Sequence, residues 1–425
     1  MKNILTNSSK NIIIIHPSGR YNGSGHYIQE WARQLLNNGY KVIILSEGNC
    51  PDIDKGVIWN KINFDGFRLS KSIRNKIEIF NPDIIIEVGV RSIPMRVSLE
   101  LKLLYPKAKF IVQAEDDENL VFKKYYPSKY NSIKLLEILD TKELTFKQLF
   151  IFFKLLDLKL SFKILFNPNF YRWVEPIMRI LCYKIADMHT TIWYPMQKRL
   201  FNKFHIKTFV IPPFINVNEF YCELKFSSIH KKILKKYSIK ENSFILFVNG
   251  TIYDFSDEIL IFIHAVKLLS KYKNIHTTII ILHINENIKN KILDIINSDK
   301  NIDLKIIGNQ KEFYYNHLIK SSHIVCAPGI EDEFNTYRMS SRLVKALAYG
   351  KPIFTFYTGF GESISKENFA FLTKTNNEIE WYEILLKAYN TFFIHPFDYN
   401  ARCFAEKYFD SKKIIKRFSK VIKFL

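Results

Sequence analysis

Charged residues gather in one short stretch in the second half of the chain. The segment APGIEDEFNTYRMSSRLVKALAYGKP, residues 327–352, follows an apolar run and contains a helical pattern that Ser340 or Ser341 can cap and Gly350 can end. Carboxylates accept hydrogen bonds from hydroxyls, whereas guanidinium and ammonium groups bind phosphate oxygens. The segment is therefore a candidate site for a ligand with both groups, such as a nucleotide. Its charged residues are Glu331, Asp332, Glu333, Arg338, Arg342, Lys345 and Lys351.

Two glycine-containing segments also follow apolar runs and precede helical patterns. The first is Gly23-Ser24-Gly25-His26 and the second is Asn249-Gly250-Thr251. Glycine lets the backbone approach a ligand closely, and a helix N-terminus offers unpaired N–H groups to an anion. The spacing differs from GxGxxG, so a dinucleotide site is not predicted. Each segment is a candidate ligand loop, although a tight turn or an ordinary helix cap explains it equally well.

The elements that would position these loops alternate short Ile- and Val-rich runs with longer amphipathic stretches, which is the pattern of parallel α/β domains. Ligands of such sheets bind beyond the carboxyl ends of the strands, where all three candidate segments lie. The expected strands are 11–16, 41–45, 83–88, 109–113, 189–193, 244–249, 277–282, 304–307, 323–327 and 352–356.

The order of these elements predicts two doubly wound domains. The first spans 1–210, with a helical insertion at about 130–186, and the second spans 211–400, followed by a basic helix at 401–425. The prolines of segment 208–220 can continue neither a helix nor a central strand, so this segment is the expected crossing between the domains.

Composition excludes several classes of protein. The 425 residues are 47% hydrophobic, which is ordinary for a globular chain. No apolar run is long enough for a transmembrane helix, and the run at 12–15 is too short for a secretion signal. The five cysteines are scattered without a CxxC pair, so neither a disulfide nor a metal site is expected. These features favour the cytoplasm.

The net charge of +21 favours anionic partners, although AT-rich coding would also enrich lysine. No basic motif interleaved with aromatics is evident, so a specific nucleic-acid partner is not expected. The basic amphipathic stretch at 141–166 fits an anionic membrane surface and, equally, a core helix with lysines at its rim. The expected location is thus the cytoplasm, with peripheral attachment to the inner face of the membrane left open.

Seven segments resemble motifs of GT-B-fold glycosyltransferases, most of all those of family 4, in the same order and over nearly the whole chain. Taken together they are far more specific than any one alone. They are GSGHYIQEWARQLLNNGYKVIILSEG, FNPDIIIEVG, YKIADMHTTIWYPMQKRL, FVIPPFINVNEF, FILFVNGTIY, LVKALAYGKPIF and TFYTGFGES.

The resemblance implies two Rossmann-like domains facing across a cleft, with an acceptor on the first and a nucleotide-sugar donor on the second. The last helix would pack back onto the first domain. The implied reaction moves a sugar to a glycan or lipid-linked acceptor of cell-surface polysaccharide, lipopolysaccharide or glycoconjugate biosynthesis, with retained configuration and without metal or cofactor. The alternative is a catalytically silent binding or scaffolding protein on the same fold.

The sequence departs from the family pattern at the nucleotide site. Lys345 stands where the family has a ribose-binding Glu, and Tyr337 stands where it has the preceding Glu. Because lysine cannot accept a hydrogen bond, ribose must be recognised differently. Thr251 and Ser256 replace the usual Arg and Lys that follow the second glycine loop. The expected donor-binding residues are Gly250, Thr251, Arg338, Arg342, Lys345 and Glu331, and Gly23, Ser24, Gly25 and His26 form the expected acceptor or diphosphate loop.

Two acids are the catalytic candidates implied by the resemblance, namely Glu115 and Glu333. Glu115 in VQAEDDE stands where the family has a histidine, and a carboxylate there could accept a proton or support a cationic transition state. The other interpretation is that this acidic run is a solvated loop.

Overall fold

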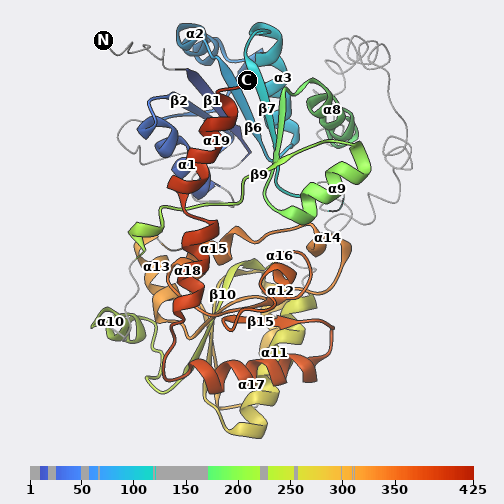
Figure 1. The fold of residues 1–425 in the computed structure, drawn as a ribbon. Coiled ribbons are helices and arrows are strands. Elements are labelled where there is room, and N and C mark those ends of the chain that lie inside the picture. Colours follow the sequence, from blue (N-terminus) through green and yellow to red (C-terminus); the bar gives the residue numbers. More distant parts are fainter. Residues whose placement is uncertain are drawn as a thin grey trace. The chain divides into compact units, whose positions relative to one another are not determined.

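The computed structural model describes residues 10–17, 25–48, 57–65, 68–117, 120, 171–220, 228–252, 257–297, 299–308, 310 and 312–425. The chain divides into two compact units (Figure 1). Unit 1 comprises Met1–Pro213 and Ser411–Leu425, and unit 2 comprises Phe214–Asp410. Each unit has its own parallel sheet with helices, which confirms the predicted α/β class with two Rossmann-like domains.

Unit 1 contains a seven-stranded sheet of order β3-β2-β1-β6-β7-β8-β9 in which every pairing is parallel. Its central strands are almost continuously apolar because helices cover both faces of such a sheet. The strands are β1 (Asn11–His16), β2 (Lys41–Ser46), β3 (Ile58–Lys61), β6 (Ile84–Val88), β7 (Lys109–Ala114), β8 (Met188–Thr191) and β9 (Phe209–Val210), beside the small pair β4 (Phe64–Asp65) and β5 (Arg68–Leu69).

The helices of unit 1 include one that the chain supplies only at its end. Helix α19 packs on α1 through an edge-to-face contact between Trp31 and Phe418, whose ring centroids are 5.2 Å apart. Trp31 is fully buried, so this contact closes the core on that side. The helices are α1 (Gly25–Asn37), α2 (Lys71–Phe80), α3 (Ser92–Leu104), α8 (Tyr171–Ile185), α9 (Tyr194–Phe204) and α19 (Ser411–Ile422).

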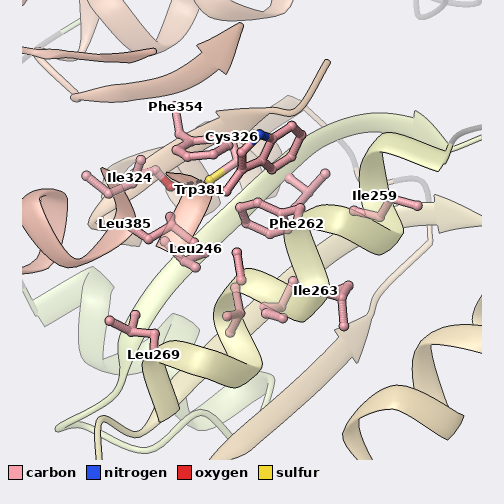
Figure 2. Packing of buried hydrophobic residues seen from close by; sticks show 14 of the residues in the cluster. Leu246, Ile259, Phe262, Ile263, Leu269, Ile324, Cys326, Phe354, Trp381 and Leu385 are labelled. Carbon is pink, nitrogen blue, oxygen red and sulfur yellow. Dashed lines mark hydrogen bonds between the residues drawn. The ribbon is translucent and has the colours of Figure 1, made fainter. Parts of the chain in front are cut away.

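Unit 2 contains a six-stranded parallel sheet of order β12-β11-β10-β13-β14-β15. One core cluster packs aromatic side chains against it: Phe354 lies 5.4 Å from Phe262 and 5.6 Å from Trp381, between ring centroids (Figure 2). The strands are β10 (Phe244–Ile252), β11 (Thr277–Ile284), β12 (Ile302–Ile306), β13 (Ile324–Ala327), β14 (Ile353–Phe356) and β15 (Ala370–Thr373).

The helices of unit 2 lie between these strands and after the last of them. They are the 3₁₀ turn η1 (Val217–Glu219), α10 (Ser228–Lys236), α11 (Asp257–Lys273), α12 (Glu286–Ile296), α13 (Glu312–Ser321), α14 (Glu333–Thr336), α15 (Ser341–Ala348), α16 (Phe360–Ser363), α17 (Glu378–Phe392) and α18 (Tyr399–Tyr408).

The end of the chain differs from the single helix expected at 401–425. Helix α18 belongs to unit 2 and α19 belongs to unit 1, with a break at Phe409 and Asp410. At the break, the amide of Ile215 donates to the carbonyl of Phe409 at 3.0 Å, and Ile215 pairs with Asp410 in a parallel bridge. The segment through which the chain enters unit 2 and the segment through which it leaves therefore lie side by side.

Two expectations concern the stretch after β7. Residues 121–170, which hold most of the expected helical insertion and the whole basic stretch 141–166, lie outside the described part of the chain. Within the part that is described, none of the helices combines the length and the apolar character needed to cross a bilayer.

Acid should destabilise unit 2 through two buried histidines. Burial, together with the nearby Lys351 ammonium, lowers the pKa of His323 to about 3 and that of His230 to about 4. His323 stays neutral and its Nδ1 accepts from the amide of Ile245 at 2.9 Å. Because the unfolded chain binds these protons near pH 6.5, the stability is fully present above that pH and falls towards pH 4 and 3, by up to about 1.4 kcal/mol per pH unit for each histidine.

The measurement is urea unfolding of the full chain between pH 7 and pH 5. We expect His323→Asn, whose side-chain oxygen can accept the same amide, to reduce the slope of unfolding free energy against pH. The matched control substitution is His264→Asn, at a histidine with 46% of its side chain exposed. Equal slopes in both variants would contradict the assignment.

Candidate functional site

Three elements of unit 2 meet where β10 ends, at the carboxyl edge of the sheet. Asn249 lies at their junction and is buried. Its side-chain amide donates to the carbonyl of Arg342 on α15 at 3.1 Å, and its side-chain oxygen accepts from the hydroxyl of Tyr315 on α13 at 2.8 Å. The strand end is thus tied to the first turn of each of these two helices.

Gly250 lets an arginine lie directly on the backbone of β10. Its φ is +134°, and a Cβ at this position would come within 1.7 Å of Nη1 of Arg342. The same Nη1 donates to the carbonyl of Asn249 at 3.2 Å. The glycine expected to admit a ligand therefore admits a protein cation, which is held at the N-terminus of α15, where an anion is also favoured.

Lys345 lies one turn after Arg342 on α15 and is paired with an acid. Its Nζ is 3.0 Å from Oε1 of Glu312, the first residue of α13. Only 9% of the Lys345 side chain is exposed, against 41% of the Glu312 side chain. A buried ammonium needs such a partner, because its desolvation would otherwise cost several kcal/mol. The pair therefore presents a carboxylate, oriented by a lysine, at the protein surface.

Tyr315 stands between these groups and remains a neutral donor. Burial raises the pKa of its hydroxyl to about 12, against the opposing effects of the Asn249 hydrogen bond and the Arg342 charge. The Lys345 ammonium lies 5.4 Å from the centroid of the tyrosine ring. The Tyr315 hydroxyl therefore keeps donating to Asn249 over the whole physiological pH range.

The acidic loop before α15 contains one residue with a clear structural task. Asp332 caps the short α14, because its Oδ1 accepts from the amide of Asn335 at 2.6 Å. Glu331 and Glu333 on either side are exposed, and the guanidinium carbon of Arg338 lies 5.1 Å from the Phe334 ring centroid. Ser340 occupies the cap position of α15, but its side chain makes no capping hydrogen bond.

A second polar cluster lies in unit 1, at the carboxyl ends of β7 and β8. Glu115 directly follows β7 and is only 6% exposed. The hydroxyl of Tyr27 on α1 donates to its Oε1. Behind it, Thr190 donates to Gln113 at 2.9 Å, and the Gln113 amide lies 3.4 Å from the Tyr27 hydroxyl. Glu115 is therefore held in one orientation by a buried chain of polar groups.

The acids next to Glu115 are also tied to other elements. Asp117 forms a salt bridge with Arg199 on α9, and Asp116 lies 3.9 Å from Arg91. Burial would raise the pKa of Asp117, but the Arg199, Lys203 and Arg179 charges outweigh burial and lower it. The interpretation of the acidic run as a solvated loop is therefore wrong for Glu115 and Asp117.

The first glycine loop lies partly outside the described residues. Gly23 and Ser24 lie outside the described residues, whereas Gly25 and His26 begin α1 and Thr251 lies in β10, in each case with only the backbone described. Glu312, Tyr315 and Tyr27 were not predicted from the sequence. Tyr27 directly follows the first glycine loop, and this position could have marked it as a site residue. Nothing in the sequence near Glu312 marks it as a partner of Lys345.

Comparisons with solved structures identify the fold. The chain is similar to a glycosyltransferase from Rickettsia africae, with 16% identity, a TM-score of 0.65 and coverage of 98% of each chain. It is similar to WaaG, a glycosyltransferase involved in lipopolysaccharide biosynthesis, with 13% identity, a TM-score of 0.62 and coverage of 97% of this chain and 99% of the other. It is also similar to the UDP-GlcNAc 2-epimerase from Neisseria meningitidis, with 15% identity, a TM-score of 0.54 and coverage of 97% and 100%.

At these identities the likeness establishes a fold, and this fold carries both transferases and an epimerase. No family model matches the sequence, and no curated protein matches it either. The chain has the two-domain GT-B fold, as its motifs predicted.

Gly250→Ala should displace Arg342 rather than unfold unit 2. The new Cβ would meet the end of a flexible side chain, which can swing away at the cost of its hydrogen bond to Asn249. Arg342→Ala loses the same bond. We therefore expect the double variant to cost less unfolding free energy than the two single variants added, by roughly 0.5–1.5 kcal/mol.

Urea unfolding of the four proteins measures this coupling. Gly39→Ala is the matched control, since Gly39 has φ +86° but no atom within 4 Å of its notional Cβ. Gly39→Ala therefore measures the effect of backbone strain alone, and its cost in unfolding free energy should add to that of Arg342→Ala. Additive costs for the Gly250 and Arg342 variants would show that the two residues do not depend on each other.

Proposed function

We propose that the chain is a glycosyltransferase that binds a nucleotide-sugar on unit 2 and transfers the sugar to a glycan or lipid-linked acceptor. The observation that carries the proposal is the arrangement at the end of β10. There, Arg342 in the first turn of α15 places its guanidinium over Gly250 of β10, and the Lys345–Glu312 pair lies beside it. The fold and the order of the sequence motifs support the same reaction class.

The chemistry of the leaving group explains why such a site would matter. When the bond from the sugar C1 to the diphosphate breaks, negative charge develops on the diphosphate while C1 bonds to the acceptor oxygen. A guanidinium and helix N–H dipoles already oriented towards that charge stabilise the transition state without reorganising. The motif resemblance adds to the proposal that configuration is retained and that no metal is required.

Glu115 is the group that we assign to the acceptor proton. It is a buried carboxylate at the carboxyl edge of unit 1, and the Tyr27 hydroxyl holds its orientation. A positioned carboxylate can accept a proton or stabilise positive charge on the sugar. Glu333, at the exposed start of α14, remains the second predicted catalytic acid.

The proposed setting is surface polysaccharide, lipopolysaccharide or glycoconjugate synthesis in the cytoplasm, at the inner face of the membrane. The net charge of +21 supports it, because such a surface attracts both anionic donors and anionic lipid. The fold match to WaaG is compatible with this setting.

A catalytically silent binding protein is the second candidate, and one observation favours it. Lys345, where related motifs carry a carboxylate, is buried and used in an internal salt bridge. If lysine in place of that carboxylate prevents donor binding, the chain would keep the fold without catalysing the reaction.

A panel of UDP-, GDP-, CMP- and dTDP-sugars tests the proposal by calorimetric binding and by donor hydrolysis. We expect one class to bind and to be hydrolysed slowly, and Arg342→Ala to weaken its binding by about tenfold or more. Arg417→Ala on α19, which removes one exposed arginine from unit 1, is the control and should bind as the unchanged protein does. Absence of binding and hydrolysis across the panel would refute the proposal.

Glu115→Gln separates the transferase from a silent binder. The amide keeps the shape of the side chain but neither accepts a proton as readily nor carries the charge. Donor affinity should stay within about twofold, and turnover should fall by about 100-fold or more. Donor binding without any turnover in the unchanged protein would favour the silent alternative.

A further inference from the structure

The Lys345–Glu312 pair places an oriented carboxylate at the proposed nucleotide site. The lysine side chain is 9% exposed and the acid 41% exposed, so the cation is the inner member and the carboxylate the outer one. A surface pair between two flexible side chains contributes little, whereas a buried ammonium constrains its partner strongly. The buried Lys345 ammonium thus fixes the position of the Glu312 carboxylate.

The position of this carboxylate relates it to Arg342, which the proposed function assigns to the diphosphate. Glu312 begins α13, which follows β12 at the carboxyl edge of the sheet. One turn later on α13, Tyr315 donates to Asn249, which in turn is bonded to Arg342. Lys345, one turn after Arg342 on α15, donates a hydrogen bond to Glu312 and so completes the set of contacts. The acid and the guanidinium therefore belong to one closed set of contacts.

A ligand that satisfies both groups must carry negative charge for Arg342 and hydroxyl donors for Glu312. A ribonucleoside diphosphate has both, because its ribose hydroxyls are separated from its phosphates by one sugar. In the dinucleotide-binding Rossmann fold, an acid accepts from the ribose 2′-hydroxyl of NAD, so a carboxylate is chemically suited to this contact. Asp332, a nearby acid, is engaged in capping α14.

We propose that Glu312, held by the buried Lys345, accepts a hydrogen bond from the ribose 2′-hydroxyl of the donor nucleotide, so that unit 2 selects ribonucleotides over 2′-deoxyribonucleotides. The inference rests on the proposed function. It assigns ribose recognition to the first turn of α13, with the lysine of α15 acting as the positioning residue for the acid.

Paired titrations test the assignment: UDP against 2′-deoxy-UDP, GDP against 2′-deoxy-GDP, and CDP against 2′-deoxy-CDP. For the nucleotide that binds, we expect the ribose form to bind about tenfold or more tightly, the loss expected when a hydrogen bond to a charged group is missing. Glu312→Gln should reduce this ratio several-fold, because its amide oxygen accepts only the weaker, uncharged hydrogen bond, while leaving 2′-deoxynucleotide affinity nearly unchanged. Lys345→Met should also lower the ratio, by freeing the acid.

The matched control is Glu286→Gln. Glu286 also lies in the first turn of a helix of unit 2 and pairs with Lys289 at 3.0 Å, but Glu286 is exposed and Lys289 is only half-buried. The ratio should not change in this variant. Circular dichroism of each variant confirms that the fold is intact, and Lys345→Met keeps the test usable should Glu312→Gln, which leaves the buried ammonium without its charged partner, fail to fold.

The outcomes separate the inference from the proposed function. If no nucleotide of any base binds, the proposed function fails. If ribose and 2′-deoxyribose forms bind equally to the unchanged protein, or if Glu312→Gln keeps the preference, nucleotide binding stands and the assignment of Glu312 is overturned. Equal weakening of both forms by Glu312→Gln would indicate a purely structural role and would also overturn it.

Discussion

The reciprocal contact between Asn249 and Arg342 holds the carboxyl edge of unit 2 together. Arg342 donates to the carbonyl of Asn249, and the side chain of Asn249 donates back to the carbonyl of Arg342. Glycine at position 250 is the condition for it, since any Cβ there would occupy the place of the guanidinium. Because Tyr315 joins the same asparagine, three elements share one junction. A ligand would meet donors whose orientation is set before it arrives.

Burial of charge is the second constraint, and it acts in both units. Lys345 in unit 2 and Asp117 in unit 1 are each paired with a partner from another element, because an isolated buried charge is too costly. The pairing also fixes direction. Glu312 and Glu115 are held by a lysine and a tyrosine, respectively, and each is an acid at a strand end where substrates of α/β folds bind. The groups that stabilise the edges thus also define the chemistry that the edges offer.

Secondary structure was largely predictable because parallel strands covered on both faces are continuous apolar runs. The runs at 11–16 and 109–113 correspond to β1 and β7. The short β9 and β15 were not predicted, since their few residues carry no pattern of their own. The basic amphipathic pattern continues through Asp410 and therefore predicts one helix, where the structure has α18 and α19. The break depends on Ile215, far away in the sequence, which pairs with that residue.

Local signals in the chain were enough to determine the elements, the glycine at the end of β10 and the cations of α15, since these depend on neighbouring residues and on periodicity. The tertiary structure decided what those cations contact. Lys345 and Glu312 are 33 residues apart, and the pair forms only because the sheet brings the starts of α13 and α15 to the same edge. Burial of Glu115 was decided in the same way, by residues such as Tyr27 of α1 that lie beside it only in the folded chain, because solvent exposure depends on neighbours in space that a linear pattern does not record.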